Sequence, residues 1–373
     1  MYVEDGLDGL FYASSANFQY LLNSTNYHWQ RNSMNNIFGY SNYRNLPEAF
    51  LYLKANGDLH IFVVPALKDT FSSYPNLHIA YLDQFEDVLA PHFSGNKIGI
   101  GFGCFDFLKE LVLEINPNLE VVDSEALLND FRAIKDSDEI ATLRKLALFT
   151  DEAIKHVVAN LKIGLKQYQV ENLVMDYGLK HDLADLAFTP TCGFKPQNSE
   201  LALEALTFDR NTVLKENTAI AFDIGYLDEG YCSDWGRSIY YGKAPDLVKN
   251  GYLALQAGQK NMVDKIVPYQ TNVNQLYDFV LEKVTELGYG DYLRFQDTKS
   301  LGHQIGIDCH EHPMLNKDVD AILKPGMVFC SEPKMFFKNE AYLRVEDMIL
   351  VTENGAEFLT HFDRELFDIE VKD

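Results

Sequence analysis

The chain has 373 residues, of which 47% are hydrophobic and 13% aromatic, which is enough for two domains with packed cores. Its 55 acidic residues outnumber its 32 basic ones and give a net charge of −23, which repels phosphate backbones and disfavours nucleic-acid binding. No apolar run comes near the ~18 to 20 residues that cross a bilayer, and the acidic start lacks the basic region of a secretory signal, so we expect a cytoplasmic protein without a membrane partner.

In residues 1–125, short apolar runs with the pattern of strands alternate with runs that have the spacing of helices. Residues 59–64 and 97–101 predict strands, whereas residues 85–89 and 107–113 have the spacing of helices. No cluster of catalytic residue types accompanies these runs. We therefore expect a separate α/β domain in this half of the chain.

Longer helical patterns begin near residue 130. Asp136 and Glu139 have the spacing of a capping box, and apolar residues then recur at helical intervals. A second helix is predicted from about residue 167 to 181, and two strands follow it. The same order then recurs, with helices over 247–263 and 273–287 before two further strands. We interpret this order as a structural repeat with a pseudo-twofold relation between its halves.

Four carboxylates and one imidazole in the second half of the chain mostly interrupt short, strand-like apolar runs. They are Asp223, Asp234, His303, Glu332 and Glu346. The two aspartates are eleven residues apart, which suits neighbouring antiparallel strands, and the two glutamates are fourteen apart on the second strand pair. Facing strand pairs would bring the four acids together. Buried acids repel one another and are costly to desolvate, unless a cation lies between them.

Two divalent metal ions are the simplest such cations. Carboxylates with one imidazole suit Mn, Co, Fe or Zn, and two ions about 3.5 to 4 Å apart can hold a hydroxide between them at neutral pH. The alternative is that each acid is a surface residue of its strand or turn. That explanation is the ordinary one for a single acid, but it fits five residues at these positions poorly.

The five cysteines are odd in number and lack CxxC spacing, which argues against a disulfide scaffold or a thiolate zinc site. Cys232, Cys309 and Cys330 each lie one or two residues from a proposed site residue. We expect small buried residues that line a crowded site, with redox regulation as the alternative.

The site residues stand in motifs that resemble those of the pita-bread metallopeptidases, most closely the Xaa-Pro dipeptidases and aminopeptidase P. The motifs are Asp223-(x10)-Asp234, Gly302-His303-x-x-Gly306-x-x-x-His310-Glu311-x-Pro313, Ser331-Glu332-Pro333 and Arg344-Val345-Glu346-Asp347. Residues 131–140 also resemble the opening of the family's catalytic domain. The resemblance implies an α+β chain with a pita-bread catalytic domain over 126–373, after a creatinase-like α/β domain over 1–125. It also implies a homodimer.

The same resemblance assigns roles to the site residues. Asp223, Asp234, His303, Glu332 and Glu346 would bind two divalent metal ions (Mn, Co, Zn or Fe), with Asp234 and Glu346 as bridges. A hydroxide between the ions would attack the scissile carbonyl, and Glu332 would shuttle the proton.

Further side chains near these motifs also receive roles. His310, seven residues after His303, would hydrogen-bond the substrate carbonyl or the oxyanion. A buried histidine paired with a carboxylate is the alternative for His310, and we expect His312 to be a loop residue. Arg237 and Arg344 are expected to orient carboxylates rather than to contact substrate.

Two positions depart from the family pattern. Proline-directed members carry a histidine in the loop before the first aspartate, whereas the residue seventeen before Asp223 is Leu206. Many relatives also have a histidine four residues before the ligand histidine, where this chain has Lys299. His181 could replace the first of these only through a remodelled loop. Lys299 could bind a substrate carboxylate or point to solvent.

The leading hypothesis is a dinuclear metal-dependent hydrolase of short peptides, with Xaa-Pro dipeptidase or aminopeptidase activity. The altered substrate-handling residues motivate an alternative, in which the same centre acts on a non-peptide small molecule, as in amidinohydrolases, ectoine hydrolases or a lyase of related fold. A third hypothesis is a non-catalytic binding module. The retention of all five ligand residues argues against that third hypothesis.

Overall fold

The structure is a computed structural model that describes residues 6–23, 27–29, 48–101, 105–183, 185–198, 209–338 and 340–372. It divides into two compact units, Met1–Arg132 and Ala133–Asp373, which we call the N-terminal and C-terminal units. Residues 126–132, which the sequence analysis assigned to the catalytic domain, therefore fall in the N-terminal unit. No helix in the described part of the chain has both the length and the apolar character needed to cross a bilayer.

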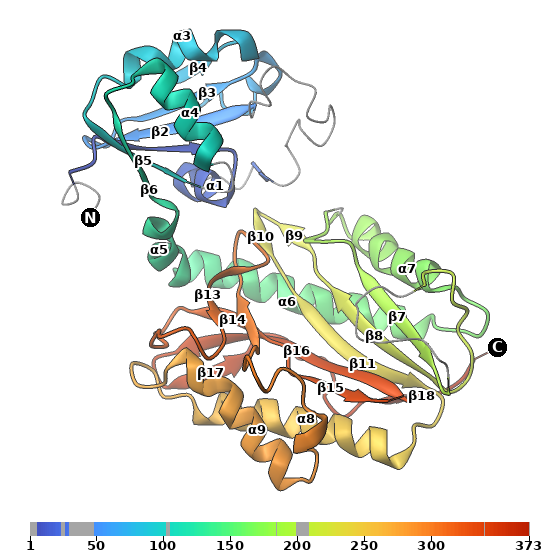
Figure 1. The fold of residues 1–373 in the computed structure, drawn as a ribbon. Helices are drawn as coiled ribbons and strands as arrows, with labels where there is room; N and C mark the ends of the chain where they lie inside the picture. The colour runs from blue at the N-terminus through green and yellow to red at the C-terminus, as the bar shows by residue number, and fades with distance from the viewer. Residues whose placement is uncertain are drawn as a thin grey trace. The chain divides into compact units, whose positions relative to one another are not determined.

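The N-terminal unit is built on a six-stranded sheet of order β4-β3-β2-β1-β5-β6 (Figure 1). The pairs β1–β2 and β2–β3 are antiparallel, and the other neighbours are parallel. The strands are β1 (Gly9–Ala13), β2 (Ala49–Lys54), β3 (Leu59–Val63), β4 (Leu77–Ile79), β5 (Lys97–Gly101) and β6 (Glu120–Asp123).

Helices and single turns connect these strands and follow the last of them. They are α1 (Ala16–Leu22), η3 (Pro65–Leu67), η4 (Leu82–Gln84), α3 (Phe85–Leu89), η5 (Ala90–His92), α4 (Phe105–Ile115), η6 (Glu125–Leu128) and α5 (Asn129–Ala133). The predicted strands over 59–64 and 97–101 are confirmed as β3 and β5. The predicted helices over 85–89 and 107–113 are confirmed as α3 and part of α4.

The C-terminal unit begins with helix α6 (Ser137–Ala159), which starts at the expected capping box. The Asp136 side chain accepts hydrogen bonds from the backbone N–H groups of Asp138 and Glu139, and the Glu139 carboxylate accepts one from the N–H of Asp136. These bonds satisfy N–H groups that the first turn leaves without partners, which is worth about 1 kcal/mol.

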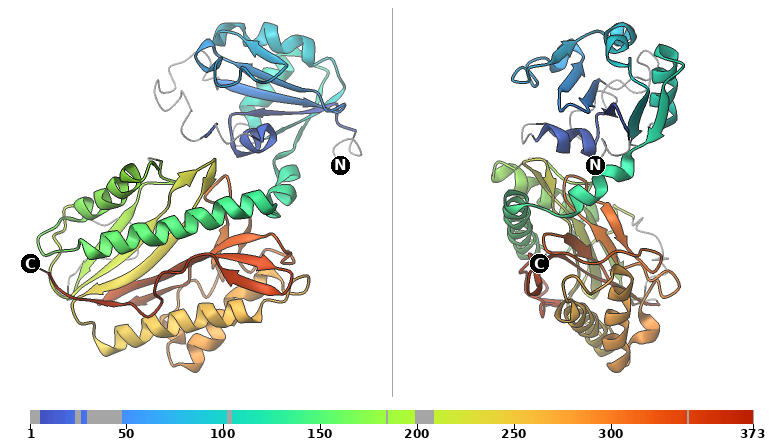
Figure 2. Two further views of the ribbon diagram at one scale, coloured as in Figure 1. Left: turned by 180° about the vertical axis from the view of Figure 1, so that it is seen from behind. Right: turned by 90° about the vertical axis from the view of Figure 1, so that its left-hand side faces the viewer.

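The predicted repeat is present as two helix pairs, each followed by strands of one large sheet. The helices are α6, α7 (Gln167–Lys180), α8 (Asp246–Lys265) and α9 (Leu276–Glu286), with single turns η7 (Val273–Gln275) and η8 (Gly290–Tyr292). Figure 2 (left) shows α6 and α8 crossing in front of the sheet, and both lie behind it in Figure 1.

The large sheet has the strand path β13-β12-β14-β16-β11-β8-β7, in which β15 and β17 also pair with β16, and β18 also pairs with β11. The halves of the repeat meet where β11 (Trp235–Tyr241) pairs antiparallel with β16 (Ala341–Thr352), seen as yellow beside red in Figure 1. The other strands are β7 (Thr191–Pro196), β8 (Thr218–Ile224), β9 (Leu227–Asp228), β10 (Tyr231–Cys232), β12 (Gly302–Gln304), β13 (Glu311–Leu315), β14 (Val328–Ser331), β15 (Lys334–Phe337), β17 (Gly355–Phe358) and β18 (Asp368–Ile369).

One carboxylate on α6 makes the stability of this unit depend on pH. Asp151 is buried and accepts a hydrogen bond from the backbone N–H of His361. Burial, only partly offset by that bond, raises the pKa of Asp151 from 3.8 to about 6. Because the folded state then binds the proton more tightly than the unfolded state, this contribution to stability is full below 3.8 and is lost as the pH rises through about 6.

As the pH rises from about 4 to about 7, we therefore expect the free energy of unfolding of the parent chain to fall by about 3 kcal/mol relative to that of the Asp151→Asn variant. Urea unfolding of both proteins in chelator, at several pH values, measures this difference. If the free energy of unfolding of the two proteins depended on pH in the same way, the raised pKa of Asp151 would be contradicted.

Candidate metal centre

The first half of the repeat supplies Asp223 and Asp234. Asp223 lies near the end of β8, between Phe222 and Ile224, whose side chains join the core under α6 and α7. Because strand side chains alternate, the Asp223 carboxylate faces the opposite side of the sheet. Asp234 directly precedes β11, at the end of the small β9–β10 hairpin that connects the two strands.

Gly236 aligns the two halves of the site. It lies opposite Asp223 on β8 and opposite Glu346 on β16, so these positions form one row across three strands. A Cβ atom on this glycine would lie 2.5 Å from Arg344 Cδ and 2.6 Å from Glu346 Oε2. The missing side chain therefore leaves the space that the Glu346 and Arg344 side chains occupy.

The second half supplies His303 and Glu332. His303 on β12 lies opposite Cys330 on β14, and Glu332 follows the end of β14. Gly302, just before the histidine, has φ +149°, and a Cβ there would lie 2.0 Å from the Cys330 carbonyl oxygen. Only glycine permits this close approach of the two backbones.

Three of the five predicted ligands converge directly. One ligand atom each from Asp234, His303, Glu346 and also Cys330 lies within 4.8 Å of all the others, and all four residues are buried. His303 Nε2 is 3.5 Å from Asp234 Oδ2. These contacts join the two halves of the repeat at one point.

Asp223 and Glu332 lie outside this group of four and are connected to it by Arg344. The guanidinium of Arg344 forms an ion pair with Asp223 through Nη1, lies 2.9 Å from Glu332 Oε2 through Nη2, and lies 3.5 Å from Glu346 Oε2 through Nε. As expected from the sequence, Arg344 contacts carboxylates. Arg237 also contacts a carboxylate, that of Asp347, and in addition donates a hydrogen bond to the backbone carbonyl of Glu346.

Burial and the neighbouring charges shift the pKa values of the carboxylates in this cluster strongly. Burial, followed by repulsion from Asp223, raises the pKa of Asp234 well above its usual range. Burial and repulsion from Asp234 do the same to Glu346. Burial alone would also raise the pKa of Glu332, but Lys334 and Arg344 lower it to about 2. If all four carboxylates were ionised, their charge would exceed that of Lys334 and Arg344, so the site must take up protons or a cation.

The residues fit a divalent cation by two independent observations. Asp234 Oδ1 and Glu346 Oε2 are buried without a hydrogen-bond partner, an arrangement that costs about 1 to 3 kcal/mol per group unless something binds there. In addition, His303 Nδ1 lies 3.0 Å from the carbonyl oxygen of Gln304 and must donate to it, which leaves the Nε2 lone pair facing Asp234. Burial, with a contribution from His310, lowers the pKa of His303 to about 4, so the ring is neutral.

The sequence analysis missed one side chain at the site and left the role of the cysteines open. Lys334 Nζ lies 2.5 Å from Glu332 Oε2, and its place two residues after that glutamate was an available signal. Cys309 Sγ donates a hydrogen bond of 3.2 Å to Asp234 Oδ2. Burial raises the pKa of the Cys309 and Cys330 thiols well above their usual range, so both are neutral. Cys104 lies outside the described residues.

The two histidines after His303 are both exposed. The ring centroid of His310 is 4.0 Å from that of His303, so the alternative of a buried, carboxylate-paired His310 is wrong. His312 was expected in a loop, and this expectation is also wrong, because it lies in β13. Strand β13 begins directly after His310 and pairs with β12, which is why His312 lies in a strand.

The structure describes two of the three residues named for the departures from the family pattern, Lys299 and His181. Lys299 Nζ forms a 2.7 Å ion pair with Asp278 on α9. His181 stacks on Tyr177 at 4.1 Å and bonds to its backbone carbonyl. Leu206 lies outside the described residues.

Comparison with known proteins agrees with this geometry. The sequence pattern of Metallopeptidase family M24 matches residues 141–353, which is more than half of the chain. An uncharacterized peptidase of Bacillus subtilis is 30% identical over 247 residues, covering 66% of this chain and 67% of the relative. An Xaa-Pro dipeptidase of Pyrococcus furiosus is 27% identical over 316 residues, covering 84% and 88%.

The solved structures show the same fold. The prolidase of Pyrococcus horikoshii superposes with a TM-score of 0.81 at 22% identity, over 97% of this chain and 96% of the prolidase. The Xaa-Pro dipeptidase of Bacillus anthracis gives a TM-score of 0.80 at 22% identity, over 98% and 96%. The expected α+β pita-bread architecture is thus confirmed. The chain belongs to metallopeptidase family M24 and is a metal-dependent hydrolase of the peptidase class.

Proposed function

We propose that the protein is an exopeptidase that binds two divalent metal ions and cleaves the first amide bond of short peptides, with proline after the scissile bond. The observation that carries this proposal is the convergence of the buried Asp234 and Glu346 carboxylates on the His303 imidazole, each with one oxygen that has no hydrogen-bond partner. The names of the relatives, an Xaa-Pro dipeptidase among them, support the substrate class.

Asp223, Asp234, His303, Glu332 and Glu346 would hold the two ions, which the donor set suggests are Mn, Co, Fe or Zn. When bound, such ions lower the pKa of water and polarise a substrate carbonyl. Arg344 keeps Asp223 and Glu332 in place, and Gln304 holds the His303 ring in one tautomer.

Glu332 is one of the two carboxylates of the set that a substrate can reach; Asp223, at 20% exposed, is the other, and the resemblance to the family assigns the proton shuttle to Glu332. Its side chain is 17% exposed, whereas Glu346 and Asp234 expose only 1% and 5%. Glu332 can therefore accept a proton from the attacking water and deliver it to the leaving nitrogen. His310, exposed beside His303, is placed to donate a hydrogen bond to the substrate carbonyl oxygen.

A peptide panel tests the proposal. Metal-loaded protein is incubated with Ala-Pro, Gly-Pro, the matching tripeptides and non-proline controls, and release of the first residue is followed. We expect turnover of the Xaa-Pro peptides that chelator abolishes and added metal restores. Stoichiometric metal without turnover of any peptide would overturn the peptidase proposal and favour a non-peptide substrate.

We expect the His310→Ala variant to lose about 100-fold in kcat/KM, because it lacks the donor to the reacting carbonyl. Metal content should not change, since His310 is not a proposed ligand. His312→Ala is the matched control, an exposed histidine two residues away in β13. Steady-state kinetics and metal analysis of both variants check this, and equal losses in the two would count against the role of His310.

A further inference from the structure

Three histidines come together in the N-terminal unit, in which the sequence analysis predicted no site. His60 lies on β3, His78 on β4 and His92 at the end of η5. His60 and Phe62 share a face of β3, and the parallel pairing of β3 with β4 puts His78 opposite Phe62. The turn η5 then brings His92 against the same face, so this histidine cluster depends on three separate elements.

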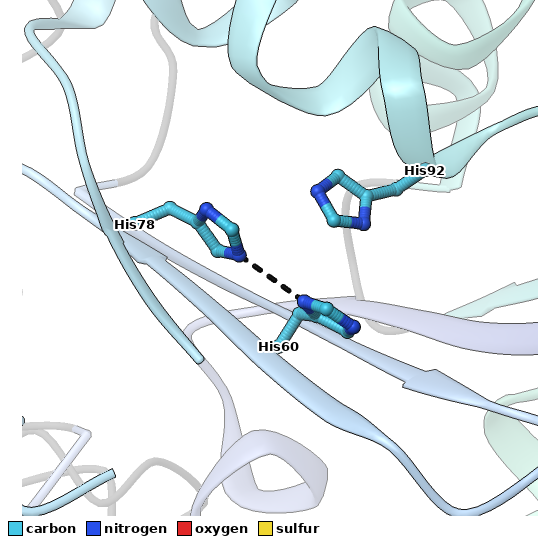
Figure 3. Close-up of side chains that lie close together, drawn as sticks. All are labelled: His60, His78 and His92. Atoms are coloured by element: carbon cyan, nitrogen blue, oxygen red, sulfur yellow. Dashed lines mark hydrogen bonds between the residues drawn. The ribbon is translucent and has the colours of Figure 1, made fainter. Parts of the chain in front are cut away.

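The rings face one another closely (Figure 3). His60 Nδ1 is 3.1 Å from His78 Nε2, and the His92 centroid is 4.5 Å from that of His60 and 5.0 Å from that of His78. One ring nitrogen from each histidine lies within 4.8 Å of the other two. All three residues are half-buried.

One nitrogen of the cluster is left without a partner. His92 Nδ1 is buried and makes no hydrogen bond, although the rings of His60 and His78 are next to it. A buried polar atom in that state costs about 1 to 3 kcal/mol. Simple ring packing against Phe62, at 4.6 Å from His78 and 5.1 Å from His92, explains the apolar contacts but not this nitrogen.

The charge state of the cluster suits metal binding. Burial, helped by the neighbouring histidines and Lys54, lowers the pKa of His92 to about 4, and burial with Lys54 lowers those of His60 and His78. The imidazoles are therefore neutral at neutral pH, which is the form that binds metal. Of the charged groups nearby, Lys54 opposes a cation and Asp58 favours one.

We propose that His60, His78 and His92 bind a borderline divalent metal ion, with zinc as the best fit. Imidazole ligands suit zinc, and Zn–N bonds of about 2.0 to 2.1 Å at tetrahedral angles separate two nitrogens by about 3.3 Å. The 3.1 Å between His60 and His78 is close to that separation, and the His92 ring has to move inward by a modest amount. A bound ion would join the edge strand β4 to η5 and leave a fourth position for water. This site is separate from the carboxylate centre and does not depend on the proposed function.

The test uses the full chain with the carboxylate centre disabled by Asp234→Asn and Glu346→Gln. After chelator treatment, equilibrium dialysis against zinc and elemental analysis should find one zinc per chain. The added substitution His92→Phe keeps an aromatic ring but removes the ligand, and we expect it to abolish this zinc. His156→Phe is the matched control, a histidine that packs against Tyr177 on α7; it should retain the zinc.

A second readout does not depend on the disabled background. In the otherwise unchanged chain, His92→Phe should lower zinc content by one equivalent and remove the visible absorption that cobalt gives in a tetrahedral nitrogen site. Absence of zinc from the disabled background, or zinc content that His92→Phe leaves unchanged in both backgrounds, would overturn the proposal.

Discussion

We expect the Asp234→Asn variant to lose more than about 100-fold of its peptidase activity while its metal-free form becomes more stable. Partners that merely orient metal ligands cost 10- to 100-fold when removed, so loss of a direct ligand should cost more. Without metal, however, the Asp234 carboxylate is buried beside Glu346 and has an unpaired oxygen. A neutral amide relieves this repulsion, which should raise the free energy of unfolding by about 1 to 3 kcal/mol.

Kinetics in saturating metal and urea unfolding in chelator measure the two effects. Asp228→Asn is the matched control, because Asp228 lies in the same hairpin but forms a surface ion pair with Lys145. The control should change neither quantity appreciably. An Asp234→Asn variant that is active, or that is destabilised in chelator, would show that the acids are not held together for a cation.

The second large effect is expected from Arg237→Met, behind the metal centre. Arg237 and Asp347 form a fully buried ion pair, and Arg237 Nη1 donates to the carbonyl oxygens of Glu346 at 2.5 Å and Gly236 at 2.8 Å. Arg237 and Arg364 together keep the pKa of Asp347 low although burial would raise it. Without Arg237, Asp347 keeps its ion pair with Arg364 but loses the fully buried one, and two buried carbonyl oxygens lose a charged donor, so we expect a loss of about 3 to 5 kcal/mol in stability.

The loss should extend to activity, because Arg237 supports the backbone that carries Glu346. Arg144→Met is the control, since its ion pair with Glu357 has both side chains exposed, at 40% and 48%. Such a pair is worth about 1 kcal/mol or less. Urea unfolding compares the variants, and similar losses for both would contradict the importance assigned to the buried pair.

The sequence indicated the elements whose signals are local. The capping box at Asp136 placed the start of α6 at the correct residue, and helical spacing found α7, α8 and α9 within a few residues of their ends. The ligand candidates were visible because an acid in an apolar strand, such as Asp223 in β8, has a high desolvation cost and needs a reason.

Contacts that depend on pairing between distant strands were not visible. Arg344 was expected to orient carboxylates, but its position between Asp223 and Glu332 follows from the register of β8, β11 and β16. The histidine cluster was missed because His60 and His78 are 18 residues apart and meet only through the parallel pairing of β3 and β4. No spacing rule in one sequence reports that pairing.

Anomalous diffraction from crystals of the metal-loaded protein tests the central claim most directly. We expect two peaks about 3.5 to 4 Å apart. Asp234 and Glu346 should each contact both ions. Asp223, His303 and Glu332 should each contact at least one of them. A single ion, or two ions that no carboxylate of this set shares, would contradict the account.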